Sequence, residues 1–396
     1  MGRGKTSAAM GYMSSHCSDK RFLFITPYLK EVDRICSLCD FEQPNGDSHS
    51  KLSDLKRMLI RGENVASSHS LFYLLDDAAL GIIRDKKYSL IVDESIDTIH
   101  REDITKKDFD LIVNTLASVE DGKLVWLDDE YSGKFNDYKE MAKSGLLFVR
   151  DSAILKVMKP DVLLAFDEVI MMTYLFGGQY QKAYLDYFGF QYKLCGIRID
   201  YVEGNPVYSF TDEPDVPPNV DYNDLISIID DDRLNYIGSS NTALSKHWFI
   251  SRSRNHKDIV KLRRNLDTFL RRRCKCKVSD VMWTCFKDVH DWMIGSEGRY
   301  STSFITLTSR ATNEYKNKSV VAYLANRFAD PNIIKFFYEK GIEINEEEFA
   351  LSEMLQFIWR SAIRDYKHID LYIPSKRMRN LLIDWIIKRN NGGLDG

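Results

Sequence analysis

Residues that could bind phosphate stand at the start of the chain, in the run Gly2-Arg3-Gly4-Lys5-Thr6. Gly-Lys-Thr after a glycine closes a phosphate-binding loop, in which backbone N–H groups and the lysine ammonium bind phosphate oxygens. The threonine hydroxyl binds Mg²⁺, and the helix that follows directs the positive end of its dipole at the anion. The full pattern is G-x-x-x-x-G-K-[ST], and its first glycine would fall before Met1. We therefore expect an incomplete loop, without that glycine and the strand before it.

A pair of carboxylates, Asp93-Glu94, directly follows the apolar run Tyr88–Val92. In nucleotide hydrolases an aspartate at this place holds Mg²⁺, and the next glutamate orients and deprotonates the attacking water. The alternative is that the pair only caps the following helix, since acidic residues suit a first turn. The presence of Gly-Lys-Thr in the same chain favours the hydrolytic interpretation.

Three polar residues near the end of the chain, Gln356, Arg360 and Arg364, are spaced by four. This spacing predicts that they lie on one face of a helix and point at a common target. Arginine suits the γ-phosphate of a nucleotide, because its delocalised charge stabilises the charge that develops in the transition state. The alternative is a helix face with ordinary salt bridges to acidic neighbours such as Glu353 and Asp365.

Apolar runs alternate with helical patterns along the chain, which predicts an α/β fold with mostly parallel sheets covered by helices. We expect strands at residues 21–25, 64–69, 88–92, 123–127, 145–149, 169–176, 303–307 and 369–374. Ligands of such sheets bind at the carboxyl ends of the strands. The residues that follow strands, and should therefore meet at one rim, are Thr26, Ser68, Asp93 and Glu94. We expect two domains, at residues 1–177 and 178–396, divided after the run that closes at Gly177-Gly178.

The composition is that of a globular protein, with 44% hydrophobic and 29% charged residues. No apolar run reaches the roughly 18 residues that a membrane span needs, and no signal peptide opens the chain, so we expect a cytoplasmic protein without membrane partners. The net charge of −3 restricts any nucleic-acid surface to a local patch. The basic helical stretch from Lys257 to Lys277 is one candidate. It is either a solvated helix face or a contact with a nucleic-acid backbone.

The order of these motifs resembles that of a superfamily 2 helicase. The residues that carry the resemblance are Gly4-Lys5-Thr6, Thr26-Pro27-Tyr28-Leu29, Asp93-Glu94-Ser95-Ile96-Asp97 and Gln356-x-x-x-Arg360-x-x-x-Arg364. Two further runs, Arg310-Ala311-Thr312-Asn313-Glu314-Tyr315 and Trp359-Arg360-Ser361-Ala362-Ile363-Arg364, are similar to those of DEAD/DEAH-like helicases encoded by phages and prophages. The resemblance covers nearly the whole chain, and its motifs are more specific as an ordered set than singly.

The resemblance implies two RecA-like P-loop domains with ATP in the cleft between them. It implies that Gly2 to Thr6 bind the nucleotide, that Thr6 and Asp93 hold Mg²⁺, and that Glu94, Gln356, Arg360 and Arg364 are catalytic. It further implies nucleic-acid contacts at Thr26, Pro27, Ser68, His69 and Arg310, and Thr173 is a looser match to the motif that couples hydrolysis to strand movement. The implied activity is ATP-dependent movement along single-stranded or forked DNA in phage replication, inside the bacterial host cell, with other replication proteins as further partners.

The chain departs from the family pattern at three places. The start of the phosphate loop is missing, the box is Asp-Glu-Ser-Ile, and the second late arginine stands four residues after the first, where three is usual. The first departure supports an alternative hypothesis, a nucleic-acid-binding protein with impaired ATPase activity. A P-loop kinase is a weaker alternative, because a kinase would not need the Asp-Glu box with the late arginines.

Overall fold

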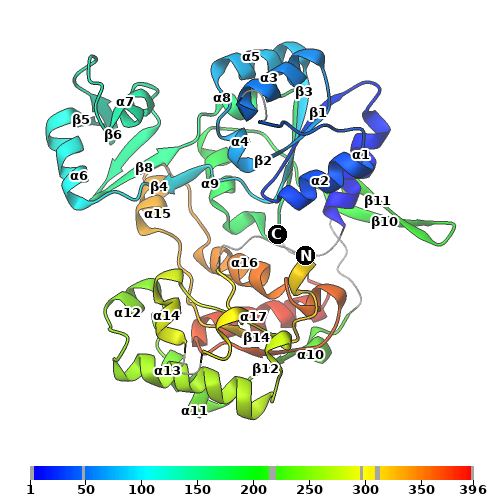
Figure 1. The fold of residues 1–396 in the computed structure, drawn as a ribbon, viewed down its shortest axis with the longest axis vertical. Helices are drawn as coiled ribbons and strands as arrows, with labels where there is room; N and C mark the ends of the chain where they lie inside the picture. The colour runs from blue at the N-terminus through cyan, green and yellow to red at the C-terminus, as the bar shows by residue number, and fades with distance from the viewer. Residues whose placement is uncertain (1–3, 47–49, 214–219, 295–297, 308–312, 394–396) are drawn as a thin grey trace.

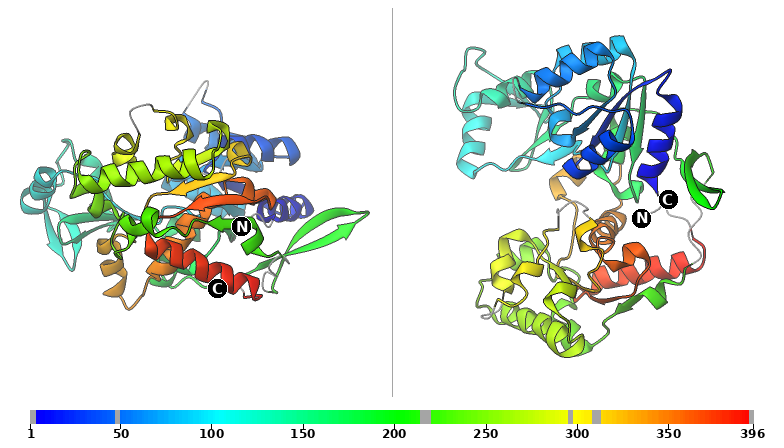
Figure 2. Two further views of the ribbon diagram at one scale, coloured as in Figure 1. Left: turned by 90° about the horizontal axis from the view of Figure 1, so that it is seen from below. Right: turned by 45° about the vertical axis from the view of Figure 1, so that its right-hand side comes forward.

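The computed structural model describes residues 4–46, 50–213, 220–294, 298–307 and 313–393, arranged as two α/β units stacked one above the other (Figure 1). A smaller antiparallel sheet lies beside the first unit, and a hairpin projects from its opposite side (Figures 1 and 2). The α/β fold with parallel sheets flanked by helices, predicted from the alternating pattern, is confirmed. None of the helices in these ranges has the length and apolar character needed to cross a membrane.

The first unit is built on a parallel sheet whose strand order is β2-β1-β3-β9. Its strands are β1 (Arg21–Thr26), β2 (Val65–Ser68), β3 (Tyr88–Asp93) and β9 (Glu168–Met172). β1 and β3 are nearly continuous apolar runs, as expected of strands that are buried on both faces. Because all four strands run parallel, their carboxyl ends meet at one edge of the sheet.

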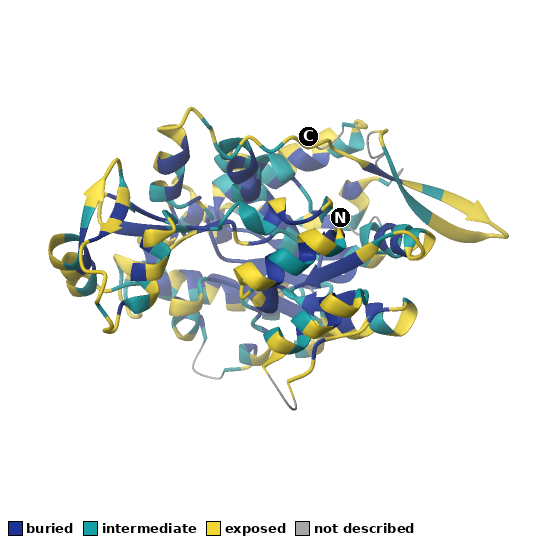
Figure 3. Ribbon diagram, turned by 90° about the horizontal axis from the view of Figure 1, so that it is seen from above, coloured by how far each residue is buried: buried dark blue, intermediate teal, exposed yellow. Residues whose placement is uncertain are grey.

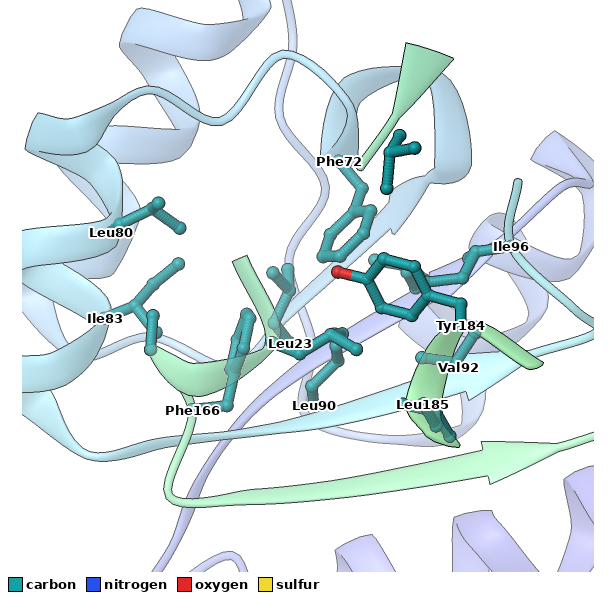
Figure 4. Packing of buried hydrophobic residues seen from close by; sticks show 14 of the residues in the cluster. Leu23, Phe72, Leu80, Ile83, Leu90, Val92, Ile96, Phe166, Tyr184 and Leu185 are labelled. Carbon is teal, nitrogen blue, oxygen red and sulfur yellow. The ribbon is translucent and has the colours of Figure 1, made fainter. Parts of the chain in front are cut away.

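Helices cover both faces of this sheet. They are α1 (Lys5–His16), α2 (Leu29–Leu38), α3 (Lys51–Arg61), α4 (His69–Phe72), α5 (Asp77–Lys86), α8 (Asp161–Leu164) and α9 (Tyr180–Tyr187). One core joins α1 and α2 to the sheet through residues such as Met13 and Ile35. The core on the other face joins α5 and α9 to the sheet through Leu80, Ile83 and Tyr184 (Figure 4).

A separate five-stranded antiparallel sheet is inserted between β3 and β9, with the order β4-β8-β7-β6-β5. Its elements are β4 (Ile99–Arg101), α6 (Lys106–Leu111), a π-helix (Ile112–Leu116), β5 (Ala117–Glu120), β6 (Lys123–Trp126), α7 (Asn136–Lys143), β7 (Leu147–Arg150) and β8 (Ala153–Val157). The strands expected at 123–127 and 145–149 are therefore present. They pair antiparallel in this insertion and do not join the parallel sheet.

The hairpin that projects from the first unit consists of β10 (Gly196–Val202) and β11 (Asn205–Thr211). Its outer part is largely exposed (Figure 3). Its base packs against α1, where the rings of Tyr12 and Phe210 lie 5.9 Å apart. α9 also packs in the first unit, which favours a link between the units that begins after Thr211. The division at residue 177 stays a prediction.

The second unit contains a parallel sheet with the strand order β12-β15-β14-β13. The strands are β12 (Ile226–Ile228), β13 (Val281–Thr284), β14 (Val320–Tyr323) and β15 (Ile369–Tyr372). Its α-helices are α10 (Tyr222–Leu225), α11 (Asp232–Asn235), α12 (Lys246–Ile250), α13 (Lys257–Thr268), α14 (His290–Met293), α15 (Pro331–Tyr338), α16 (Glu346–Ile358) and α17 (Lys376–Asn390). Its short 3₁₀ and π turns include η3 (Tyr236–Gly238), η4 (Phe269–Arg273), η5 (Val278–Asp280), η6 (Lys287–Val289), η7 (Ser301–Ser303), η8 (Asn313–Tyr315) and η9 (Ala362–Asp365). A further 3₁₀ turn, η2 (Phe176–Gly178), precedes α9 of the first unit.

The prediction of a strand at residues 303–307 is wrong. Residues Ser301–Ser303 form a 3₁₀ turn instead, and the segment meets the edge of β13 at a single bridge between Trp283 and Phe304. The tight turn just before this point leaves only a short extended piece beside β13, which is too short for a ladder.

Candidate active site

The carboxyl ends of β1, β3 and β9 meet the start of α1, and the predicted phosphate and magnesium residues lie together there. The carboxylate of Asp93, the last residue of β3, accepts hydrogen bonds from two hydroxyls. Thr6 Oγ1 donates to Oδ1 at 3.4 Å, and Thr26 Oγ1 donates to Oδ2 at 3.3 Å. Asp93 thus contacts Thr6, which is 87 positions away in the sequence, and Thr26, which is 67 positions away. The contacts form because parallel strands end at a common edge of the sheet.

Gly4 sets the geometry of the chain where it enters α1. Its φ of 79° lies in the left-handed region, and its carbonyl accepts the N–H of Ala8 at 2.8 Å. A Cβ at this position would lie 2.3 Å from the ring of Tyr208 in the hairpin. Glycine is therefore required both for the backbone conformation and for the close approach. No side chain in the described ranges caps α1, and the start of a helix is a place at which an anion is stabilised.

The ammonium of Lys5 is held by the strand next to β3. Its Nζ donates to the carbonyl oxygen of Thr173 at 2.5 Å, and it lies 5.8 Å from the centre of the Tyr174 ring. Thr173 directly follows β9. Lys5 thus points along the rim formed by the carboxyl ends of the strands, the side of the sheet at which phosphate binds in parallel α/β folds.

Asp93 is well suited to hold a cation. Burial, together with the negative charges of Glu94 and Glu31, raises the pKa of Asp93 to about 7. A divalent cation would favour its ionised form, and carboxylate and hydroxyl oxygens are ligands that Mg²⁺ accepts. The described ranges contain no cluster of three or more His, Cys, Asp or Glu residues.

Glu94 stands directly after β3 in a conformation that is rare for a residue with a side chain. Its φ is 67°, and its N–H donates to the carbonyl oxygen of Met172 at 3.1 Å. The side chain is half-buried. Strained backbone of this kind occurs often at functional sites, where surrounding contacts hold it in place. The arrangement fixes the carboxylate one residue beyond the magnesium candidate.

Arg360 brings a cation from the second unit to this edge. Its side chain is buried, and Nη1 makes one long hydrogen bond of 3.5 Å to the carbonyl oxygen of Thr306. Nε is buried and has no hydrogen-bond partner within the part of the chain that the structure describes. Burial lowers the pKa of Arg360, while nearby Tyr28 and Glu94 of the first unit oppose this effect. A buried, poorly satisfied guanidinium that faces the first unit fits an anionic ligand such as phosphate.

The three late polar residues do not share one helical face, and this expectation is corrected. α16 ends at Ile358, and Trp359 caps it, so Arg360 follows the helix. Arg364 lies in the separate turn η9. Gln356 remains on α16 and is half-buried. Glu353 pairs with Arg327 at 2.8 Å. The catalytic roles of Gln356 and Arg364 stay predictions.

Four of the residues predicted to contact nucleic acid lie at the same rim but have different surroundings. Thr26 and His69 are buried, and a ring nitrogen of His69 lies 3.0 Å from the backbone carbonyl oxygen of Asp93. Ser68 caps α4, and Pro27 is half-buried. Nucleic-acid contacts at these four residues stay predictions. Arg310, and Gly2 and Arg3 of the phosphate loop, lie outside the described residues.

Two features of the site could not be read from motifs. One is the hairpin residue Tyr208, whose ring lies against Gly4 although the two residues are 204 positions apart. The other is an ion pair between Lys30 of the first unit and Glu314 of the second. Both features connect segments that are far apart in the sequence, and no local sequence pattern predicts either of them.

Comparisons with known proteins agree with this architecture. The model of the YonV C-terminal Rossmann-like domain matches residues 220–386, and that of the YonV middle domain matches residues 99–156, the inserted sheet. The chain is 36% identical over 406 residues to the SPbeta prophage-derived uncharacterized protein YonV of Bacillus subtilis (strain 168), covering 98% of this chain and 97% of that protein. A solved structure of apo XPD aligns with a TM-score of 0.51 at 13% identity, over 99% of this chain and 94% of that chain. This last likeness shows a shared fold.

Proposed function

Because this chain belongs to the YonV family and has an XPD-like fold, we propose that it is an ATP-dependent motor that moves along or unwinds DNA. The prophage origin of the relative supports a role in phage replication. The proposal rests above all on one observation. The buried Arg360 of the second unit lies within electrostatic reach of Glu94 of the first unit, beside the Asp93–Thr6 pair.

In the proposed site the first N–H groups of α1 and the Lys5 ammonium bind the phosphates of ATP, while Thr6 and Asp93 hold Mg²⁺. When bound, Mg²⁺ neutralises negative charge on the phosphate oxygens. Glu94 accepts a proton from the attacking water, and Arg360 stabilises the charge that develops on the γ-phosphate. Lys5 must leave the carbonyl oxygen of Thr173 to reach a phosphate. This exchange would couple nucleotide binding to the end of β9.

Movement along a strand would follow from closure of the two units around the nucleotide, since each unit contributes part of the site. The ion pair between Lys30 and Glu314 and the buried Arg360 are the contacts that such closure would alter. Binding to the nucleic-acid backbone would be sensitive to salt and largely indifferent to sequence.

The test is ATP hydrolysis by the full chain with Mg²⁺, measured with and without single-stranded DNA. We expect DNA to stimulate turnover, and Glu94→Gln to lower it by roughly 10²- to 10⁴-fold, the contribution of a general base. Glu42→Gln is the matched control, because Glu42 is exposed and its recorded hydrogen bonds use only backbone atoms. It should leave turnover unchanged.

The result that would overturn the proposal is an absence of hydrolysis in a folded wild-type chain, or equal residual rates in wild type and Glu94→Gln. Binding of DNA without hydrolysis would instead support the nucleic-acid-binding alternative. The hydrogen bond from Lys5 to the carbonyl oxygen of Thr173 favours the nucleic-acid-binding alternative, because it holds the Lys5 ammonium away from a phosphate.

A further inference from the structure

A pocket of about 500 Å³ lies in the second unit, between α13 with its continuation η4 and the segment around Tyr300. α13 lies on the side of this unit that faces away from the first unit (Figures 1 and 2). The pocket is therefore separate from the candidate active site. Its lining includes five arginines, namely Arg263, Arg264, Arg271, Arg272 and Arg299.

The sequence of α13 explains why so many arginines reach one pocket. Ile259, Leu262 and Leu266 are buried in the core of the second unit and fix the inner face of the helix. The residues that line the pocket form two neighbouring rows with a spacing of four, close to one turn of a helix. These rows are Arg263-Asp267-Arg271 and Arg264-Thr268-Arg272.

Most of this positive charge has no acidic counterpart in the described ranges. Asp267, the one acidic residue of the described lining, already lies 2.7 Å from Nε of Arg271. Arg263 donates to the carbonyl oxygen of Trp292 at 3.1 Å. Arg264, Arg272 and Arg299 are exposed, and no ion pair joins them to a described residue. Like charges that are gathered in this way repel one another, so an anion would stabilise the arrangement.

The rest of the lining is apolar and aromatic. Leu266, Leu270, Trp283 and Met293 lie at the inner side, and the guanidinium of Arg299 stands 5.5 Å from the centre of the Tyr300 ring. The volume falls within the range of about 300–1,000 Å³ of typical small-molecule sites. An arginine rim over an apolar floor fits a nucleotide unit, whose phosphate is anionic and whose sugar and base are less polar.

We propose that this pocket is a second nucleic-acid site, which binds a nucleotide unit of a single strand through its phosphates. A polymer is favoured over a free nucleotide because basic residues continue beyond the pocket along the same segment. These residues are Lys257, Lys261, Lys275 and Lys277. The inference goes beyond the proposed motor, since binding here requires neither ATP nor hydrolysis.

The test measures binding of a fluorescent single-stranded oligonucleotide to the full chain, without ATP, over a range of salt concentrations. We expect the triple substitution Arg264→Ala, Arg272→Ala and Arg299→Ala to weaken binding at least tenfold. The slope of the logarithm of the binding constant against the logarithm of the salt concentration should become shallower by about two. Each lost phosphate contact on a single strand accounts for about 0.7 of this change. The matched control is Lys367→Ala with Lys376→Ala, two exposed lysines of the second unit that lie outside the lining and outside the basic segment.

A photoreactive oligonucleotide locates the bound strand independently of affinity. Cross-links to the peptide that contains Tyr300, lost in the triple variant, would support the inference even if the chain does not hydrolyse ATP. Wild-type affinity in the triple variant, or cross-links confined to the first unit, would overturn it. Displacement of the oligonucleotide by AMP at an equal phosphate concentration would also overturn it, in favour of a free-nucleotide pocket. A melting temperature for each variant verifies that it is folded.

Discussion

At the scale of single residues, Asp93 combines a place in the proposed magnesium site with a cost in stability. Its carboxylate is held by two hydroxyls and lies near the negative charges of Glu94 and Glu31, which raise its pKa together with burial. A carboxyl whose pKa is higher in the folded than in the unfolded chain releases its proton at lower pH when unfolded. Ionisation therefore destabilises the fold progressively from about pH 4, and the full penalty is present above about pH 7.

Asp93→Asn should remove this penalty. Its amide oxygen can accept the hydrogen bond of one of the two hydroxyls, Thr6 or Thr26, and its amide nitrogen can donate to the oxygen of the other. We expect the variant to be more stable than wild type at pH 8, by on the order of 1–4 kcal/mol. The difference should shrink toward pH 5. Urea unfolding without Mg²⁺ at the two pH values measures it, and Asp97→Asn is an exposed control nearby. A difference of equal size at both pH values would contradict the assigned pKa.

At the scale of elements, α15 shows how one helix of the second unit secures the inserted sheet. Phe336 of α15 is fully buried, and its ring lies 4.9 Å from that of Phe148 on β7. The adjacent ion pair, Lys335 with Asp151 at 2.8 Å, is exposed on both sides. Burial of the aromatic side chain should therefore dominate the contact.

Phe336→Ala should lower the free energy of unfolding by about 3–5 kcal/mol, because it leaves a cavity where the core cannot fully collapse. Lys335→Ala, at the neighbouring position, should change it by less than about 1 kcal/mol. Urea unfolding gives both values, and limited proteolysis should show faster cleavage within residues 99–157 only in Phe336→Ala. Equal effects of the two substitutions would show that the ion pair holds the insertion.

The same scale shows which parts of the fold were open to prediction. β1, β3 and β15 could be predicted, because each is an apolar run next to a clear turn or polar pair. β13 and β14 were not expected, although both are fully buried, because neither has a periodic pattern. The insertion between β3 and β9 was also missed. Its strands have ordinary strand sequences, and only pairing distinguishes an antiparallel sheet from a parallel one.

The candidate site shows the same division. The meeting of Gly4-Lys5-Thr6 with Asp93 could be predicted, since a loop before a helix and the end of a parallel strand share one edge. The prediction of one helix that continues through Arg364 was wrong. A spacing of four residues does not indicate where a helix ends, and this helix ends at Ile358. The position of Arg360 against the first unit depends on the packing of the two units, which no local pattern encodes.

At the scale of the whole molecule, Arg360 joins the two units at a price in stability. It is buried, Nε lacks a hydrogen-bond partner among the described residues, and burial lowers its pKa. A buried charge with few partners destabilises the protein unless a ligand compensates it. Such a residue is expected where function requires the charge at a later step of the cycle.

Arg360→Met replaces the guanidinium by an apolar side chain of similar length. We expect the ligand-free variant to be more stable than wild type by about 1–3 kcal/mol, because an unsatisfied buried polar group is removed. DNA-stimulated ATP hydrolysis should fall by at least about 10³-fold, as for loss of an arginine finger. Arg377→Met is the contrasting control. Arg377 donates to Asn326 and to the carbonyl oxygen of Arg327, so its loss should destabilise the fold. If Arg360→Met instead lowers stability and leaves ATP hydrolysis unchanged, Arg360 is a structural residue of the interface between the units. Another group must then complete the nucleotide site.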